Sequence, residues 1–414
     1  MRSASLTWLF AALLLPGCRD KGGGGRDAVA AASVQALAEE LRPSLERLSG
    51  LRATKPFTIR TQDATAIRAY VVQRLAEEMP PEELSGLHDT YALLGLIPDT
   101  LDLHSLLLDL YAEQVVGYYD PGTRTMYVLE GTSPSALRPV LAHELVHALQ
   151  DQHTNVDSLI SSGRGSDRQA AAHAALEGHA TIVMFALLAE DAEKRELNPA
   201  ALPNPAAQLR QGLEAPDPEF PVFGRAPAIV RETLMFPYVG GADFVHSVWS
   251  QDSAGHVAPI GNALPQSTEQ ILHPVAKFVR ERDAPTELRF DAVPPEGWRI
   301  RREDTFGELE TAILLGHHLG AAARAKANGW DGDRYRLLEN DRNERVFVWH
   351  TIWDDAASAD AFAAAMRQIA SARTGRTMRV ELIDIGGRPG VRVVDAGTSS
   401  AGMERMTVRI EQGK

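Results

Sequence analysis

The chain is poor in cysteine and carries fewer basic than acidic side chains. One cysteine in 414 residues excludes a disulfide framework and every zinc or iron–sulfur site built from several thiolates. The formal net charge is −13, from 42 basic and 55 acidic residues, which argues against a nucleic-acid binder that neutralises phosphates. The sequence also has no glycine-rich turn followed by Lys-Ser or Lys-Thr, so no P-loop for a nucleoside triphosphate is expected.

The N-terminus lacks an apolar run long enough to cross a membrane. Residues 6–15 are apolar apart from Thr7 and follow Arg2, whereas a membrane-spanning helix needs about 20 residues. A short run of this kind is typical of a secretory signal peptide. We therefore expect residues 1–17 to be a signal that is removed on export.

The segment Leu15-Pro16-Gly17-Cys18 resembles the lipobox of bacterial lipoproteins. The resemblance implies that Cys18 carries a lipid and begins the mature chain, which would then be anchored to the membrane. Residues 22–25 are glycines, which neither pack nor sustain a helix, so residues 18–31 fit a flexible tether. We expect an exported protein that is lipid-anchored to the bacterial cell envelope, on the outer membrane or the periplasmic face. The alternative is a plain signal peptide with an incidental cysteine.

The length predicts two domains, because 414 residues exceed what one compact core usually needs. Residues 32–280 contain mostly helical patterns. Residues 281–414 contain strand patterns around one helix, with no evident chemistry of their own. The expected fold class is therefore α+β, with a mainly helical first domain that has a small sheet and an active-site helix, followed by a smaller C-terminal α+β domain.

Turn and proline signals set the expected boundaries of the elements that matter for function. Two strands at 115–119 and 125–129 flank a turn and predict a hairpin. Pro139 is expected to start a helix that ends near Gln152. An alanine-rich helix is expected from 167 to 194. Further helices are expected at 228–236 and 239–250, after a proline-rich and irregular stretch from 195 to 227.

The strongest chemical signal is the pentapeptide His143-Glu144-Leu145-Val146-His147. Two histidines four residues apart on a helix face the same side and can bind one metal ion. Zinc sites of this type have three protein ligands and leave one position for water, whose pKa falls to about 7. Glu144 lies at the edge of the same helix face, where it can take a proton from that water as general base.

A third ligand has to come from elsewhere, and the residues leave three candidates open. His153 follows His147 by six residues, the spacing of the third histidine in metzincins, but Gln150 replaces the glycine that those enzymes need midway. Glu177 lies thirty residues after His147 in the second long helix and resembles the ligand glutamate of gluzincins. His173, one turn before Glu177, is the reserve candidate.

Other polar residues are candidates for supporting roles. Tyr238, after Pro237 at an expected helix start, and His273, at the end of an expected helix over 268–272, could stabilise the negative charge that develops on a substrate oxygen. Asp151 could hydrogen-bond a ligand histidine. The strand 127–129 could pair with an extended substrate, or it could be an ordinary hairpin strand.

Several segments together resemble a little-characterised group of bacterial zincin-like lipoproteins and secreted proteins of gluzincin type. They are 117–121, 143–153, Glu177-Gly178, 236–238 and 267–270. The resemblance implies a zinc metallopeptidase that acts on a peptide or protein, with Zn²⁺ bound by His143, His147 and Glu177. Two alternatives stay open: a zincin-fold lipoprotein that binds a peptide or protein partner without turnover, and an amidase that acts on a cell-wall linkage.

Overall fold

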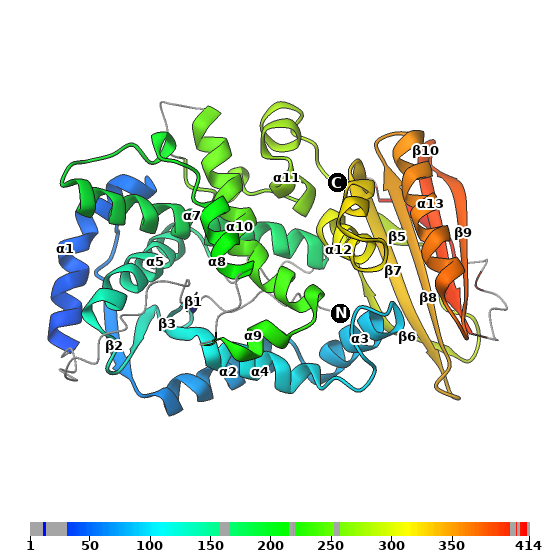
Figure 1. The fold of residues 1–414 in the computed structure, drawn as a ribbon, viewed down its shortest axis with the longest axis horizontal. Helices are drawn as coiled ribbons and strands as arrows, with labels where there is room; N and C mark the ends of the chain where they lie inside the picture. Colours follow the sequence, from blue (N-terminus) through cyan, green and yellow to red (C-terminus); the bar gives the residue numbers. More distant parts are fainter. Residues whose placement is uncertain are drawn as a thin grey trace.

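A computed structural model describes residues 11–13, 31–156, 165–214, 218, 220–251, 257–397, 403 and 406–411. Within these residues the chain has the expected α+β fold (Figure 1). Helices dominate residues 31–280, and a five-stranded sheet dominates the rest. Cys18 lies outside the described residues, as do most of the expected signal peptide and tether, so their assignment stays a prediction.

The helical part is organised around one long central helix. Its helices are α1 (Ala31–Ser49), α2 (Ala64–Glu78), α3 (Pro81–Leu93), α4 (Leu103–Gln114), α5 (Pro134–His153), α7 (Ser166–Glu193), α8 (Ala206–Glu214), α9 (Pro221–Arg225), α10 (Ala228–Gln251) and α11 (Thr268–Leu272). α7 packs against α5, α10 and α1. Among the described helices, α7 is long and apolar enough to cross a membrane, yet 89% of its apolar window is buried inside the protein. It is therefore a core helix of this fold.

A four-stranded sheet lies beside α5, in the order β1 (Ala11–Leu13), β3 (Val115–Asp120), β4 (Thr125–Leu129) and β2 (Thr58–Gln62). β3 and β4 form the expected antiparallel hairpin. β2 runs parallel to β4 and covers its other side. The suggestion that residues 127–129 present a free edge to a substrate is therefore wrong, because β4 is an interior strand.

The C-terminal part is an antiparallel sheet with helices on one face. The sheet has the order β6 (Trp298–Asp304), β7 (Trp330–Asn340), β8 (Arg345–Trp353), β10 (Arg388–Ala396) and β9 (Thr377–Ile385). Alternate residues of a strand point to opposite faces. Phe347 and Trp349 of β8 accordingly join the main apolar core under α12 (Gly307–Leu319) and α13 (Ala356–Ala372), whereas Val346 and Val348 pack against the small sheet of β5 (Leu288–Phe290) and β11 (Val408–Ile410).

Two helices continue through prolines where the sequence predicted a boundary. α5 begins at Pro134, capped by the Ser133 hydroxyl, and passes through Pro139. α10 passes through Pro237, so Tyr238 lies inside a helix rather than at its start. Each proline removes one backbone hydrogen bond. Both helices are largely buried, and tertiary packing offsets that loss.

The main apolar core is continuous across the two expected domains. One continuous cluster of buried apolar side chains includes Val34 at one end of the sequence and Val393 at the other. The proline-rich stretch 195–227 is also not wholly irregular, since it contains α8 and α9. The two parts of the chain therefore differ in the kinds of elements that they contain, but their main apolar packing is continuous.

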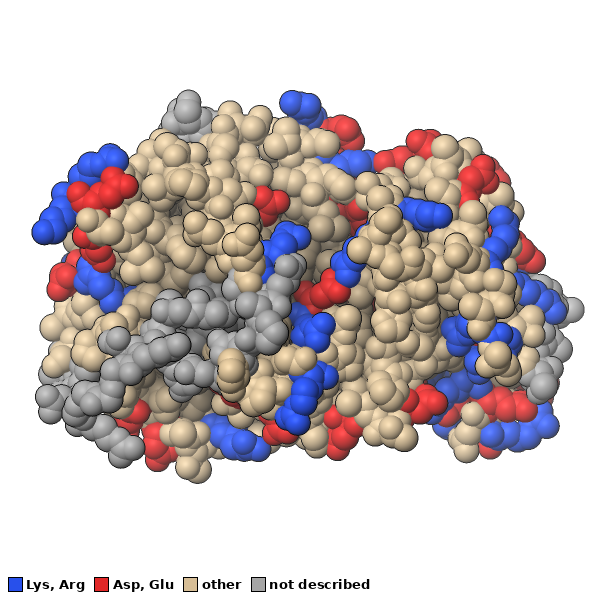
Figure 2. Space-filling view, viewed as in Figure 1, with Lys and Arg blue, Asp and Glu red and all other residues tan. Residues whose placement is uncertain are grey.

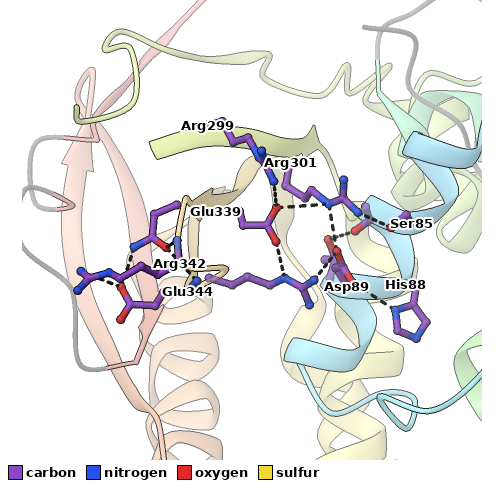
Figure 3. A network of polar contacts seen from close by, with 12 residues as sticks. Ser85, His88, Asp89, Arg299, Arg301, Glu339, Arg342 and Glu344 are labelled. Carbon is purple, nitrogen blue, oxygen red and sulfur yellow. Dashed lines mark hydrogen bonds and ion pairs between the residues drawn. The ribbon is translucent and has the colours of Figure 1, made fainter. Parts of the chain in front are cut away.

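In addition to the continuous apolar core, charged side chains connect α3 to the C-terminal sheet. Asp89 of α3 lies 3.1 Å from Arg301 Nε and 3.0 Å from Arg345 Nη2. Glu339 of β7 contacts the same two arginines at 3.9 and 3.5 Å and also accepts from Arg299 at 2.8 Å (Figure 3). Elsewhere, on the face shown in Figure 2, acidic and basic side chains are interspersed.

Candidate metal centre

α5 places the two motif histidines side by side, as their four-residue spacing predicts. The Nε2 atoms of His143 and His147 are 3.1 Å apart, and the ring centroids are 4.8 Å apart. Both side chains are buried, with exposures of 4% and 1%. The Nε2 edges of both rings therefore point at the same small volume inside the protein.

α7 brings Glu177 to the same volume. Its Oε2 atom lies 3.0 Å from His143 Nε2 and 3.5 Å from His147 Nε2, and the side chain is fully buried. Donor atoms that surround one zinc ion tetrahedrally, at about 2.0–2.1 Å, lie about 3.3–3.4 Å from each other. The three atoms thus form one face of such a tetrahedron, and these residues fit a metal ion.

The other two ligand candidates have different partners. His153 is exposed, and its Nε2 donates to the carbonyl oxygen of Arg52 at 2.7 Å, so it is not part of the group. His173 Nε2 lies 3.3 Å from Oε1 of Glu177, the oxygen that does not face the other two histidines. His173 is therefore placed to orient the carboxylate of Glu177.

The buried group is strongly polarised. Burial by itself raises the pKa of Glu177, but the neighbouring charge of His147 and the hydrogen bond from His143 outweigh it and lower that pKa well below its usual range. Burial lowers the pKa of His143. For His147, burial also acts to lower the pKa, yet the charge of Glu177 raises it overall. A carboxylate held ionised beside imidazole nitrogens is a suitable donor set for a cation.

Glu144 and Tyr238 lie at the same group. Glu144 is fully buried, and its charge is among the influences that raise the pKa of His147. The Tyr238 ring is 6.2 Å from the His143 ring, between centroids, at an interplanar angle of 29°. Burial raises the pKa of Tyr238 well above its usual value, and the charges of Glu177 and Glu144 raise it further. The phenol therefore stays protonated at neutral pH.

His273 is not brought to this group. Its Nε2 lies 2.8 Å from Glu308 of α12. Its helix, α11, meets α7 at the first turn, where Thr268 N donates to Asp167 at 3.0 Å. Ten residues separate Asp167 from Glu177, which is about 15 Å along a helix. His273 therefore belongs to the contact between the helical part and the C-terminal part.

Asp151 accepts a hydrogen bond from the Tyr119 hydroxyl at 3.0 Å. The residue next to it, Gln150, contacts a ligand histidine: its Oε1 lies 2.8 Å from His147 Nδ1. In the sequence alone, Gln150 stands out only because it occupies the position of the metzincin glycine. Its position one turn after His147 on a helix face that already carried both histidines was the signal that could have identified it.

A second cluster of carboxylates has a lysine at its centre. One oxygen each of Glu269, Asp283 and Asp354 lies within 4.8 Å of the others. Lys277 Nζ lies 3.2, 2.7 and 2.6 Å from these three residues. The ammonium group occupies the place that a metal ion would take, so this cluster is an ion-pair network.

Comparisons with known proteins give a family-model match to the C-terminal part and a distant structural match that covers more of the chain. Residues 297–410 match a family model described as a domain of unknown function, DUF8575. This range includes none of the candidate metal ligands His143, His147 and Glu177 (the metal group). No curated protein matches the chain. A crystal structure from Chloroflexus aurantiacus, described as a "putative hydrolase with a novel fold", aligns with 65% of this chain and 95% of its own at 16% identity and a TM-score of 0.34. Neither fold nor activity follows from a likeness at that level.

Proposed function

We propose that this protein is a zinc-dependent peptidase of gluzincin type. The convergence of His143, His147 and Glu177 from two helices, with Glu144 buried beside them, is the observation that carries the proposal. Two imidazoles and one carboxylate are the ligand set of the gluzincin type of catalytic zinc site, which leaves a fourth position open.

Each residue of the site has its own role in the proposed hydrolysis. A zinc ion bound by the three ligands would lower the pKa of a water molecule to about 7 and polarise a substrate carbonyl. Glu144 accepts the proton that the attacking water loses and then gives it to the leaving amine. The protonated phenol of Tyr238 donates a hydrogen bond to the carbonyl oxygen as negative charge develops there.

The proposed location follows from the sequence of the N-terminus. A lipid on Cys18 and the glycine-rich tether would hold the peptidase on the cell envelope, where its substrates would be exported peptides or proteins. The chain is acidic overall, so attraction to anionic lipid headgroups would not hold it there without the lipid.

Metal analysis of the purified full chain, combined with digestion of a broad peptide library, tests the proposal. The wild-type chain should contain about one zinc ion per molecule and cleave peptides. Glu144→Gln should retain the metal and lose cleavage, because the amide cannot accept the proton. Glu130→Gln, at an exposed position of the same chain, is the matched control and should behave as wild type. Equal cleavage by wild type and Glu144→Gln would refute the assignment.

A further inference from the structure

The side chain of Gln150 connects α5 to α7 beside the metal ligands. It is completely buried. Its Oε1 atom lies 2.8 Å from His147 Nδ1. Its Nε2 atom lies 3.0 Å from the carbonyl oxygen of Leu176 and 3.0 Å from Nδ1 of His179. Leu176 and His179 flank Glu177 in the sequence, so this amide holds α7 at the level of the third ligand.

The chemistry of the partners determines the direction of each hydrogen bond. The Leu176 carbonyl oxygen can only accept, so the amide nitrogen of Gln150 must face it. The amide oxygen of Gln150 then faces His147 Nδ1, which must carry a hydrogen in order to donate. In neutral His147 the other nitrogen, Nε2, is consequently a lone pair that points at His143 and Glu177.

His179 extends the same chain of hydrogen bonds to a third helix. Its Nε2 lies 3.1 Å from the carbonyl oxygen of Ser49, at the end of α1, and must therefore donate. Its Nδ1 then carries a lone pair and accepts the second amide hydrogen of Gln150. The Ser49, His179 and Gln150 side chains are each fully buried, so water does not compete for these bonds.

We propose that Gln150, anchored by His179 and the Ser49 carbonyl, is a positioning residue for the metal centre. It fixes His147 in the tautomer that can bind a cation, and it holds the helices of His147 and Glu177 at the separation that the ligands need. The inference rests on the proposed function only in that the three ligands bind a metal ion.

A glutamine suits this place better than the carboxylate that often orients a ligand histidine. Glu144 and Glu177 already bring two negative charges to a buried site, which a divalent cation neutralises. A third carboxylate would leave an uncompensated charge there. It would also set a carboxylate oxygen against the Leu176 carbonyl oxygen, where Gln150 now donates.

Three variants of the full chain test the proposal. Gln150→Met removes the hydrogen bonds at similar volume, and Gln150→Glu keeps an acceptor for His147 but loses the donor. Gln152→Met is the matched control, because Gln152 lies on the same helix but bonds the backbone of Lys55. The affinity for Zn²⁺ and Co²⁺ is measured by equilibrium competition with a chelator. Thermal unfolding and the ¹⁵N shifts of the histidine rings are measured on the metal-free chain.

We expect both Gln150 variants to bind Zn²⁺ about 10- to 100-fold more weakly than wild type, and Gln152→Met to stay within about threefold. In metal-free Gln150→Met, His147 should change from the Nδ1-protonated form to a mixture of tautomers. Tighter binding by Gln150→Glu would overturn the proposal, since it would show that acceptor strength alone matters.

Two further outcomes separate this inference from the proposed function. Unchanged metal affinity and an unchanged His147 tautomer in Gln150→Met would refute the positioning role and leave the peptidase proposal intact. A wild-type chain that binds no metal would refute the metal centre. If Gln150→Met does not fold, His179→Phe replaces it, because phenylalanine can keep the edge contact with Trp249. It should weaken Zn²⁺ binding less than the loss of Gln150 would, and affinity equal to wild type would count against the anchoring role.

Discussion

Gly178 of α7 and Gly241 of α10 lie against each other with no room for a side chain on either residue. A Cβ atom on Gly178 would lie 2.0 Å from the carbonyl carbon of Gly241. A Cβ atom on Gly241 would lie 1.9 Å from the carbonyl oxygen of Ala174. Gly178 directly follows Glu177, and Gly241 lies one turn beyond Tyr238. This backbone contact therefore sets how closely the tyrosine approaches the metal group.

Gly178→Ala should strongly destabilise the protein. The added methyl group has to push α7 and α10 apart, and overpacking of a buried contact costs about 1–3 kcal/mol, with this site at the upper end. Thermal or urea unfolding measures the change. Gly224→Ala in α9 is the control, because a Cβ atom there meets nothing within 4 Å, and it should stay within about 1 kcal/mol of wild type. Equal stabilities of the two variants would contradict the contact.

Glu177→Ala should abolish tight metal binding, whereas His153→Ala should not. Loss of a direct ligand should cost more than the roughly 10- to 100-fold that loss of a ligand's hydrogen-bond partner costs. His153 bonds the Arg52 carbonyl and lies outside the group, so its variant should stay close to wild type. Zinc affinity of the purified variants decides between them, and the reverse pattern would assign the site to the metzincin type.

Tyr238→Phe should lower kcat by about 10²- to 10³-fold, the usual loss when one donor to a developing oxyanion is removed. The KM and the zinc content should change little, because the phenol is not a ligand and the ring contact with His143 is kept. Steady-state kinetics on a peptide that the wild type cleaves is the measurement. A change confined to KM would place Tyr238 in substrate binding instead.

His350→Leu should make the protein less sensitive to acid. Burial lowers the pKa of His350 from 6.5 to about 3, and neither ring nitrogen has a hydrogen-bond partner among the residues that the structure describes. Between these pH values the unfolded chain binds a proton that the folded chain does not. The free energy of unfolding therefore falls as the pH decreases through this window and is unaffected above it.

The size of that effect can be measured by urea unfolding at pH 7.5 and pH 4.5. The loss of stability between the two should be smaller in His350→Leu than in wild type, by about 2.7 kcal/mol. His104→Leu, at an exposed position, should leave the loss unchanged. An identical loss in wild type and His350→Leu would show that this histidine does not contribute.

The candidate metal ligands were predictable because each of them has a local signature. His143, Glu144 and His147 follow from helical spacing, and Glu177 from its resemblance to a gluzincin ligand. The supporting contacts were not predictable in the same way. Gln150 and Asp151 both lie about one turn after His147 on α5, and their other partners distinguish them, because Gln150 also bonds Leu176 of α7 whereas Asp151 bonds Tyr119 of β3.

The errors in the fold have a similar origin. Pro139 and Pro237 favour helix boundaries locally, and the packing of α5 and α10 overrides that preference. The strand 127–129 has the same local pattern whether it lies at an edge or in the interior of a sheet. Its place was decided by β2, which comes from a segment more than sixty residues earlier in the chain.

The depth of the metal group has a kinetic consequence. His143, His147 and Glu177 are at most 4% exposed, so the side chains that would hold an ion are shielded from solvent. Release would require α5 and α7 to separate briefly. The rate of release would then depend on how often the fold opens rather than on the strength of the coordination bonds. Removal by a chelator should then proceed at a rate independent of chelator concentration once the chelator is in excess.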